Sequence, residues 1–208
     1  MDANGWLVVC ALGKKDDADA QGDCTLYIEF TKRKLDNLPK RPNDGTKRDT
    51  VASGWFDDDA GFPEFGMQPW YPWRERIGRV IVLDNWVPKS CRYLFDGLNY
   101  CVRFDLLGLD TSRANSFGGM FRGCSSVEQL LDADRFNTSN VEDMSYMFMN
   151  CLKLRAVSMV GWNTLKVTNV EYMFSGCEPY VLVEESQTAF LDEVVHSTVH
   201  GVWSRAVG

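Results

Sequence analysis

The chain has 208 residues, of which 45% are hydrophobic and 25% charged, and its formal net charge is −7. This composition is ordinary for a folded protein with one or two cores, and the negative charge disfavours nucleic acid and anionic membranes as partners. No stretch reaches the roughly 18 apolar residues of a membrane span, so we expect no membrane insertion. The first residues, MDANGWLVVCALGKKDD, do not predict a secretory signal.

Residues 1–90 show no repeat and predict a β-rich cap region. Strands are expected at 5–12, at 24–31, where apolar and polar residues alternate, and at 79–83. Residues 32–68 are rich in Pro, Gly, Asp and Lys, which predicts a long irregular loop.

The second half of the chain repeats one phrase. Met-Phe-x-x-Cys begins at Met120, Met147 and Met173, and a worn copy begins at Leu94. The copies start 26 or 27 residues apart, a period typical of stacked units of the leucine-rich-repeat kind. One unit cannot bury its own apolar face, so neighbouring units must stack. Such a scaffold presents a surface, which favours binding over catalysis.

Each copy predicts a short helix, a left-handed cap and a short strand. Ser139 and Glu142 match a capping box at one helix start. A residue that tolerates the left-handed conformation precedes each cysteine position: Gly97, Gly123, Asn150 and Gly176. Helices are expected near 113–122, 140–149 and 166–175, and parallel strands near 102–107, 127–132 and 154–160.

These patterns predict an α/β fold. Residues 91–182 would form a short leucine-rich-repeat solenoid of about four turns, with parallel strands on one face and short helices on the other. The β-rich region 1–90 would cap one end. Residues 183–208 carry apolar residues at helical spacing and predict a helix that caps the other end.

The seven cysteines are odd in number, so at least one thiol is outside any intramolecular disulfide. Cys124, Cys151 and Cys177 occupy the same place in successive repeats, which predicts a buried ladder of reduced thiols. A disulfide framework or a metal site is the alternative.

The repeats resemble those of the BspA-like leucine-rich-repeat surface proteins. The copies at 109–124, 136–151 and 162–177 are similar to that family's phrase F-x-T-S-x-V-x-x-M-x-x-M-F-x-x-C, and Trp70 to Val82 is similar to the segment that leads into it. The family is bacterial, and its members are typically surface proteins implied in adhesion to host proteins or other cells. The resemblance therefore implies a non-catalytic protein-binding module, secreted or at the cell surface. An intracellular inhibitor or assembly component is the alternative, because the chain shows no signal peptide.

Other chemistry has a weaker basis in the sequence. Glu193, His196 and His200 are spaced to offer three metal ligands, although a polar helix face is the favoured interpretation. Residues 57–59 are three aspartates without the spacing of an EF-hand loop, which favours a solvated turn. No nucleophile elbow, phosphate-binding loop or Cys/His dyad is visible. We predict no enzyme activity, no cofactor and no metal.

Two segments outside the repeats offer binding chemistry. Residues 32–48 carry seven basic side chains, which could dock an acidic partner or form a solvated loop. Trp70, Tyr71 and Trp73 could stack on a glycan, but the favoured interpretation is that they plug the first open turn of the stack.

Strand alternation selects a partner-binding face on the concave side of the predicted sheet. Its aliphatic members would be costly to leave exposed, and such patches often mark protein contacts. The predicted partner is a host or cell-surface protein, and the oligomeric state stays open. The predicted face consists of Arg103, Asp105, Leu107, Gln129, Leu131, Ala156, Ser158 and Val160.

Overall fold

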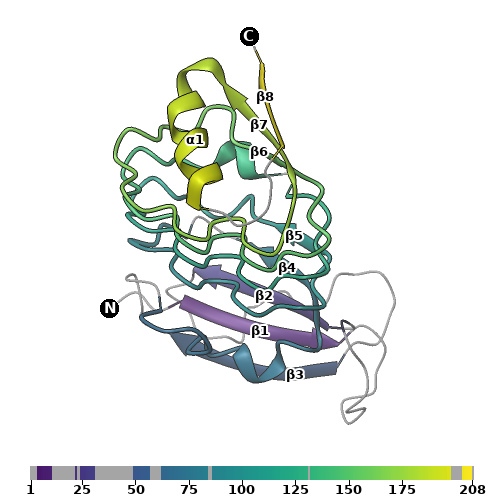
Figure 1. Cartoon of the computed structure of the whole chain (residues 1–208). Coiled ribbons are helices and arrows are strands. Elements are labelled where there is room, and N and C mark those ends of the chain that lie inside the picture. The colour runs from purple at the N-terminus through teal and green to yellow at the C-terminus, as the bar shows by residue number, and fades with distance from the viewer. Residues whose placement is uncertain are drawn as a thin grey trace.

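Stacked turns of the chain lie between an N-terminal sheet and a C-terminal helix with its own strands (Figure 1). The computed structural model describes residues 4–10, 22, 24–30, 49–56, 62–83, 86–130, 132–197 and 203–207. The basic segment 32–48 and the aspartates 57–59 therefore lie outside the described residues.

The N-terminal sheet has the strand order β3-β1-β2-β4-β5. Its strands are β1 (Asn4–Cys10), β2 (Cys24–Phe30), β3 (Asp49–Phe56), β4 (Ile77–Val82) and β5 (Arg103–Asp105). β1 pairs antiparallel with β2 and β3, whereas β4 pairs parallel with β2 and β5. Since β5 belongs to the first repeat, the sheet continues directly into the stack.

The predicted loop 32–68 is wrong in its second half. β3 lies inside it, and Phe62 and Gln68 are buried. The stretch DTVASGWF is short and contains glycine, so its local pattern does not indicate a strand. It becomes one by pairing with β1, a contact far away in sequence that local periodicity does not reveal.

The helices predicted near 113–122, 140–149 and 166–175 are also wrong, because these segments form consecutive turns. Successive backbone N–H groups alternate between two kinds of acceptor, a carbonyl oxygen of the next repeat and a carbonyl oxygen of the same turn. In the third repeat, the N–H groups of Tyr146 and Phe148 donate to Glu171 and Met173 of the next repeat. The intervening N–H groups, such as that of Met147, donate three residues back within the turn. In an α-helix, every N–H group would instead donate to the carbonyl oxygen four residues earlier.

Positive φ angles explain why a helix cannot form. Tyr146 has φ 57° and Asn150 has φ 60°, and equivalent residues in the other repeats are similar. Two left-handed residues four positions apart interrupt any α-helix. The predicted left-handed conformation before each cysteine position is confirmed at Gly97, Gly123, Asn150 and Gly176, although no helix ends there. The predicted capping box is absent, since the Glu142 N–H donates to the Asn115 carbonyl oxygen of the preceding repeat.

Burial of the repeated phrase is confirmed. The methionine, phenylalanine and cysteine of all three full copies are buried. The phenyl rings stack along the axis: Phe148 lies 5.7 Å from Phe121 and 5.2 Å from Phe174, with interplanar angles of 1° and 10°. Identical side chains at successive levels produce one continuous core.

Parallel pairing recurs at both ends of the repeats, in two separate sheets. Gln129 bridges Ala156, which begins β6 (Ala156–Ser158). β6 pairs parallel with β7 (Tyr180–Glu184), and β7 with β8 (Trp203–Val207). Strands β5 and β6 lie within the segments predicted at 102–107 and 154–160, and each is three residues long. The described part of the segment predicted at 127–132 contributes only the bridge at Gln129.

The C-terminal segment is only partly the predicted helix. Helix α1 (Thr188–Ser197) buries Phe190 and Val194, but the chain then forms β8. Buried Gln187 connects this segment to the repeats, because its amide donates to the carbonyl oxygens of Met159 and Trp162 at 2.9 and 2.7 Å. Short 3-10 helices occur at η2 (Tyr71–Trp73), η3 (Ala133–Arg135) and η4 (Glu185–Gln187).

Candidate functional site

The predicted strand face carries two charged residues, one of which pairs with a residue outside the face. Arg103 and Gln129 are exposed, and Asp105 lies 3.7 Å from the guanidinium of Arg79 on the neighbouring strand. Ala156 and Ser158 are half-buried within β6. No concentration of unpaired charge marks this face among the described residues.

The predicted aliphatic column is incompletely described. Leu107 is 59% exposed and Val160 is half-buried. Leu131 lies outside the described residues. The structure therefore describes the first and third side chains of the column but not the second, which lies between them in the stack. The strand face stays a hypothesis.

A second surface, formed by the stacked turns, carries more chemistry. Asp96 and Arg122 occupy the same position in successive repeats, where Met149 and Ser175 follow. Stacking brings the two charges into contact: Arg122 Nε lies 2.7 Å from Asp96 Oδ1, and Nη2 lies 3.3 Å from Oδ2. Asp96 is only 3% exposed, so this ion pair is shielded from water on its acidic side. A two-point contact of this kind fixes the guanidinium in one orientation.

Aromatic rings cover the guanidinium of Arg122. Its central carbon lies 4.5 Å from the ring centroid of Phe65 and 5.3 Å from that of Tyr93. Phe65 is nevertheless 60% exposed. The Arg92 guanidinium lies 5.0 Å from Tyr93 and pairs with Asp143 at 3.1 Å. We call Phe65, Arg92, Tyr93, Asp96 and Arg122 the arginine–aromatic cluster.

A glycine makes room for this cluster. Tyr93, Gly119, Tyr146 and Tyr172 are equivalent in successive repeats, and all have positive φ. A Cβ atom at Gly119 would lie 2.3 Å from the Tyr93 ring, so the missing side chain lets this ring pack closely against the second repeat. Tyr146 and Tyr172 instead stack on each other at 5.4 Å.

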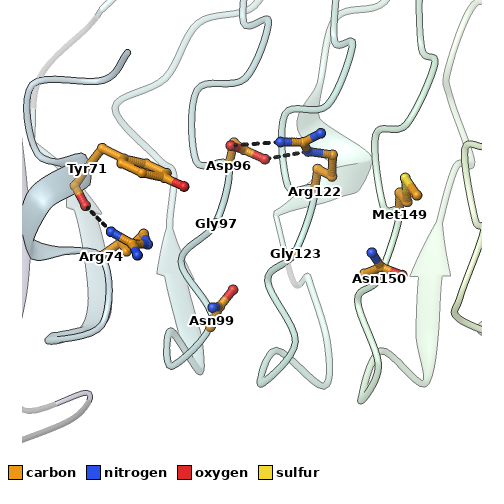
Figure 2. A pocket seen from close by; sticks show the side chains of 9 residues that line it. All are labelled: Tyr71, Arg74, Asp96, Gly97, Asn99, Arg122, Gly123, Met149 and Asn150. Carbon is orange, nitrogen blue, oxygen red and sulfur yellow. Dashed lines mark hydrogen bonds and ion pairs between the residues drawn. The ribbon is translucent and has the colours of Figure 1, made fainter. Parts of the chain in front are cut away.

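A pocket of about 220 Å³ lies beside the cluster (Figure 2). Asp96 and Arg122 point toward each other along one side of it, and Tyr71 and Arg74 lie at one end. The Arg74 guanidinium packs 4.5 Å from the Tyr71 ring centroid. The remaining lining residues are Gly97, Asn99, Gly123, Met149 and Asn150. The pocket is therefore bounded by planar polar groups that their neighbours hold in place.

The three aromatic residues before β4 have two different environments. Trp70 is buried against Phe62, with ring centroids 5.8 Å apart, and Trp73 packs against the core. These positions agree with the plug interpretation. Tyr71 instead reaches the pocket.

Burial determines the electrostatics of the ion pair. Loss of water around Asp96 raises the pKa of its carboxyl group, while Arg122 and the Gly66 N–H oppose that shift. The Gln68 amide donates to the Tyr93 carbonyl oxygen and so anchors the segment that carries Phe65. The cluster is thus held by charge, hydrogen bonds and ring contacts together.

Nucleophile or metal chemistry has little support in the described residues. Cys91, Cys101, Cys124, Cys151 and Cys177 are free and buried, and burial raises the pKa of each thiol. Cys24 is disulfide-bonded. Within the part of the chain that the structure describes, no three potential ligands gather around one metal position. Glu193 is exposed, and the side chains of His196 and His200 are not described.

None of the cluster residues belongs to the predicted binding face. The sequence nevertheless contained a signal: Asp96 and Arg122 are opposite charges 26 residues apart at equivalent repeat positions. The contribution of Phe65 carried no such signal, because it comes from outside the repeats.

The comparisons with known proteins concern the repeats. Residues 89–186 match a family model described as "Mycoplasma protein of unknown function, DUF285". The match covers 98 of the 208 residues. No curated protein and no solved structure matches the chain. Among the described helices, none is both long and apolar enough to cross a bilayer.

Proposed function

We propose that this chain is a non-catalytic protein-binding module of the BspA-like leucine-rich-repeat kind, and that it acts in bacterial adhesion to host or cell-surface proteins. The short solenoid serves as a rigid support. Its core is a ladder of methionine, phenylalanine and cysteine, and its variable positions carry the binding chemistry. Repeat stacks commonly use extended surfaces in this way.

The arginine–aromatic cluster carries the proposal. Tyrosine and arginine are enriched among the residues that dominate protein interfaces, particularly where neighbours hold them rigid. Arg122 is fixed by Asp96 and by two rings, so little side-chain entropy is lost on binding. Phe65 and Met67 beside it are 60% and 54% exposed, and they supply apolar area for a partner to cover.

Two observations favour a surface location over the intracellular alternative. Cys24 is disulfide-bonded, and disulfides persist mainly in oxidising compartments. The free thiols that the structure describes are buried, which protects them from the same oxidants.

The test is adhesion of beads coated with this chain to cultured mammalian epithelial cells. We expect the wild-type beads to bind more than beads coated with an unrelated acidic protein. Phe65→Ser and Arg92→Glu should each reduce binding by about tenfold or more, the effect of losing one interface anchor. Leu165→Ser is the matched control, because Leu165 is 92% exposed and lies outside the cluster.

Melting curves establish that each variant is folded before adhesion is measured. Equal adhesion of wild-type and unrelated beads would refute the adhesive function. Adhesion that survives both cluster substitutions would move the binding surface elsewhere on the chain.

A further inference from the structure

The pocket beside the cluster exists because two successive repeats lack a side chain at the left-handed position. A Cβ atom at Gly97 would lie 3.1 Å from Tyr71 Cε2, and one at Gly123 would lie 3.5 Å from Asn99 Oδ1. The next repeat has Asn150 at the same position, which closes the hollow. About 220 Å³ corresponds to roughly seven water volumes, which suits one ring with its substituents.

The lining is positively charged in a negatively charged chain. It contains the guanidinium groups of Arg74 and Arg122 and the single carboxylate of Asp96, whereas the whole chain carries −7. Asp96 engages only Nε and Nη2 of Arg122. Arg74 donates from Nη1 to the Tyr71 carbonyl oxygen at 3.4 Å and pairs through Nη2 with Glu75 at 3.2 Å. The first contact is long, and Glu75 is 56% exposed, so such a pair contributes little. An anionic group therefore has cationic donors available on two sides.

The uncharged groups of the lining further restrict the class of ligand that fits the pocket. The Asn99 amide NH2 donates to the carbonyl oxygens of Gly123 and Gly97 at 2.6 and 3.2 Å, which leaves its side-chain oxygen as an acceptor. The Asn150 carboxamide also lines the pocket, and the Tyr71 hydroxyl at one end of the pocket can both donate and accept. A simple carboxylate would use donors alone. Ring hydroxyl groups donate and accept at once, so they match this mixed set.

We infer that the pocket binds one acidic saccharide residue, a sugar ring that bears a carboxylate, as the terminal unit of a glycan on the partner. Arg74 and Arg122 would hold the carboxylate, and the two carboxamides would hold ring hydroxyls. The inference deepens the proposed function and rests on it for the setting of a surface partner. The binding itself is a property of the isolated chain.

Calorimetry and ligand-observed NMR with the full chain test this inference. The probes are N-acetylneuraminic acid and glucuronic acid, with galactose as a ring without carboxylate and N-acetylglutamate as a carboxylate without a ring. We expect both acidic sugars to bind at least about tenfold more tightly than the other two. Asn99→Ala and Arg74→Ala should each weaken binding about tenfold, the effect of one lost charged or bidentate hydrogen bond.

Asn140→Ala and Arg155→Ala are the matched controls, because both residues are exposed and lie outside the pocket. Equal binding of N-acetylglutamate would overturn the saccharide assignment and indicate a peptide carboxylate. No binding of any probe by the folded wild type, or binding that both pocket variants retain, would overturn the site. Cell adhesion lost in Phe65→Ser but kept in Asn99→Ala would leave the proposed function standing without this pocket.

Discussion

The thiol of Cys151 donates a hydrogen bond to the carbonyl oxygen of Phe121 in the preceding repeat, across 3.1 Å. Cys124 and Cys177 make the equivalent bonds to Phe95 and Phe148, both at 3.2 Å. Each thiol therefore bonds to a carbonyl group of the preceding repeat, although the carbonyl groups of Phe121 and Phe148 also accept a backbone N–H, and it fills a small space in the core. This double role explains why cysteine recurs where alanine would fit the volume.

Removing one rung of this thiol ladder should loosen the stack. We expect Cys151→Ala to lower the free energy of unfolding by about 1–2 kcal/mol. The substitution removes one of the two hydrogen bonds to the Phe121 carbonyl oxygen, which keeps the bond from the Cys124 N–H, and it leaves a small void in the core. Urea denaturation followed by circular dichroism measures the change. Lys153→Ala, on the exposed turn that follows, should stay within about 0.5 kcal/mol of wild type. A cost for Cys151→Ala no larger than this control would contradict the role assigned to the thiol.

The buried thiols should also make stability depend on alkaline pH. Burial raises the pKa of Cys101 and of Cys177 to about 12 from an ordinary value of 9.0. Above pH 9 the unfolded chain releases protons that the folded chain retains, so their contribution is full below pH 9 and is lost between about pH 9 and 12. Native maleimide labelling at pH 8 should leave the five free thiols of the described residues unmodified, whereas urea without reductant should expose them. Rapid native labelling would show that they are accessible.

The phenyl stack should carry a large share of the stability. Phe148 lies between two parallel rings, so Phe148→Ala removes contacts on both sides and should cost about 3–5 kcal/mol. Met147→Ala in the same turn should cost about 2–5 kcal/mol. Leu165→Ala is the control, because this side chain is 92% exposed. Denaturant midpoints that do not separate the core variants from the control would mean that the ladder is not packed.

The two kinds of ion pair should differ in their effect on stability. Arg122→Ala leaves the nearly buried carboxylate of Asp96 without its cation and should cost about 2–4 kcal/mol. Arg155 lies 3.6 Å from Glu128 on the exposed strand side, and Arg155→Ala should change stability by less than about 0.5 kcal/mol. The two ion pairs should also differ in their response to 1 M salt, because screening weakens the exposed pair more than the shielded pair. Similar costs for both substitutions would contradict the shielding of Asp96.

The predicted strand face can be compared with the arginine–aromatic cluster in the adhesion assay. Leu107→Lys and Val160→Lys place charges on the described part of the aliphatic column, and Leu107 is 59% exposed, so the fold should tolerate its change. If the cluster is the binding surface, we expect both variants to adhere within about twofold of wild type, because peripheral substitutions carry little interface energy. A loss as large as that of Phe65→Ser would favour the strand face.

The core of the repeats could be predicted from sequence because the same residue types return at a fixed period. Burial of Met147, Phe148 and Cys151 follows from that recurrence, whatever the backbone between them does. The local conformation could not be predicted in the same way. Apolar offsets of three and four residues fit an α-helix, but they also fit consecutive three-residue turns whose alternate N–H groups bond to the next repeat. The positive φ of Tyr146 was unexpected, because a bulky residue rarely adopts it.

The candidate site was less accessible to sequence reasoning. The contact between Asp96 and Arg122 follows from repeat register and could have been found by comparing equivalent positions. The contribution of Phe65 could not, because it depends on how a segment outside the repeats lies against them. Strand β3 was missed for the same physical reason: its partner is distant in sequence.

The alternating hydrogen bonds of the turns have a consequence for how such a chain can change in length. Each turn accepts bonds from the turn before it and donates an equivalent set to the turn after it. A segment of 26 residues could therefore be duplicated or removed, and the new neighbours would meet through the same pattern. A single residue inserted within the hydrogen-bonded turns would exchange the N–H groups that face the next turn with those that face inward, whereas the spacing of 27 between Met120 and Met147 shows that an extra residue is tolerated elsewhere in a repeat. Evolution in steps of whole turns would thus preserve the stack, while the few positions such as Asp96 and Arg122 that differ between turns remain free to acquire new chemistry.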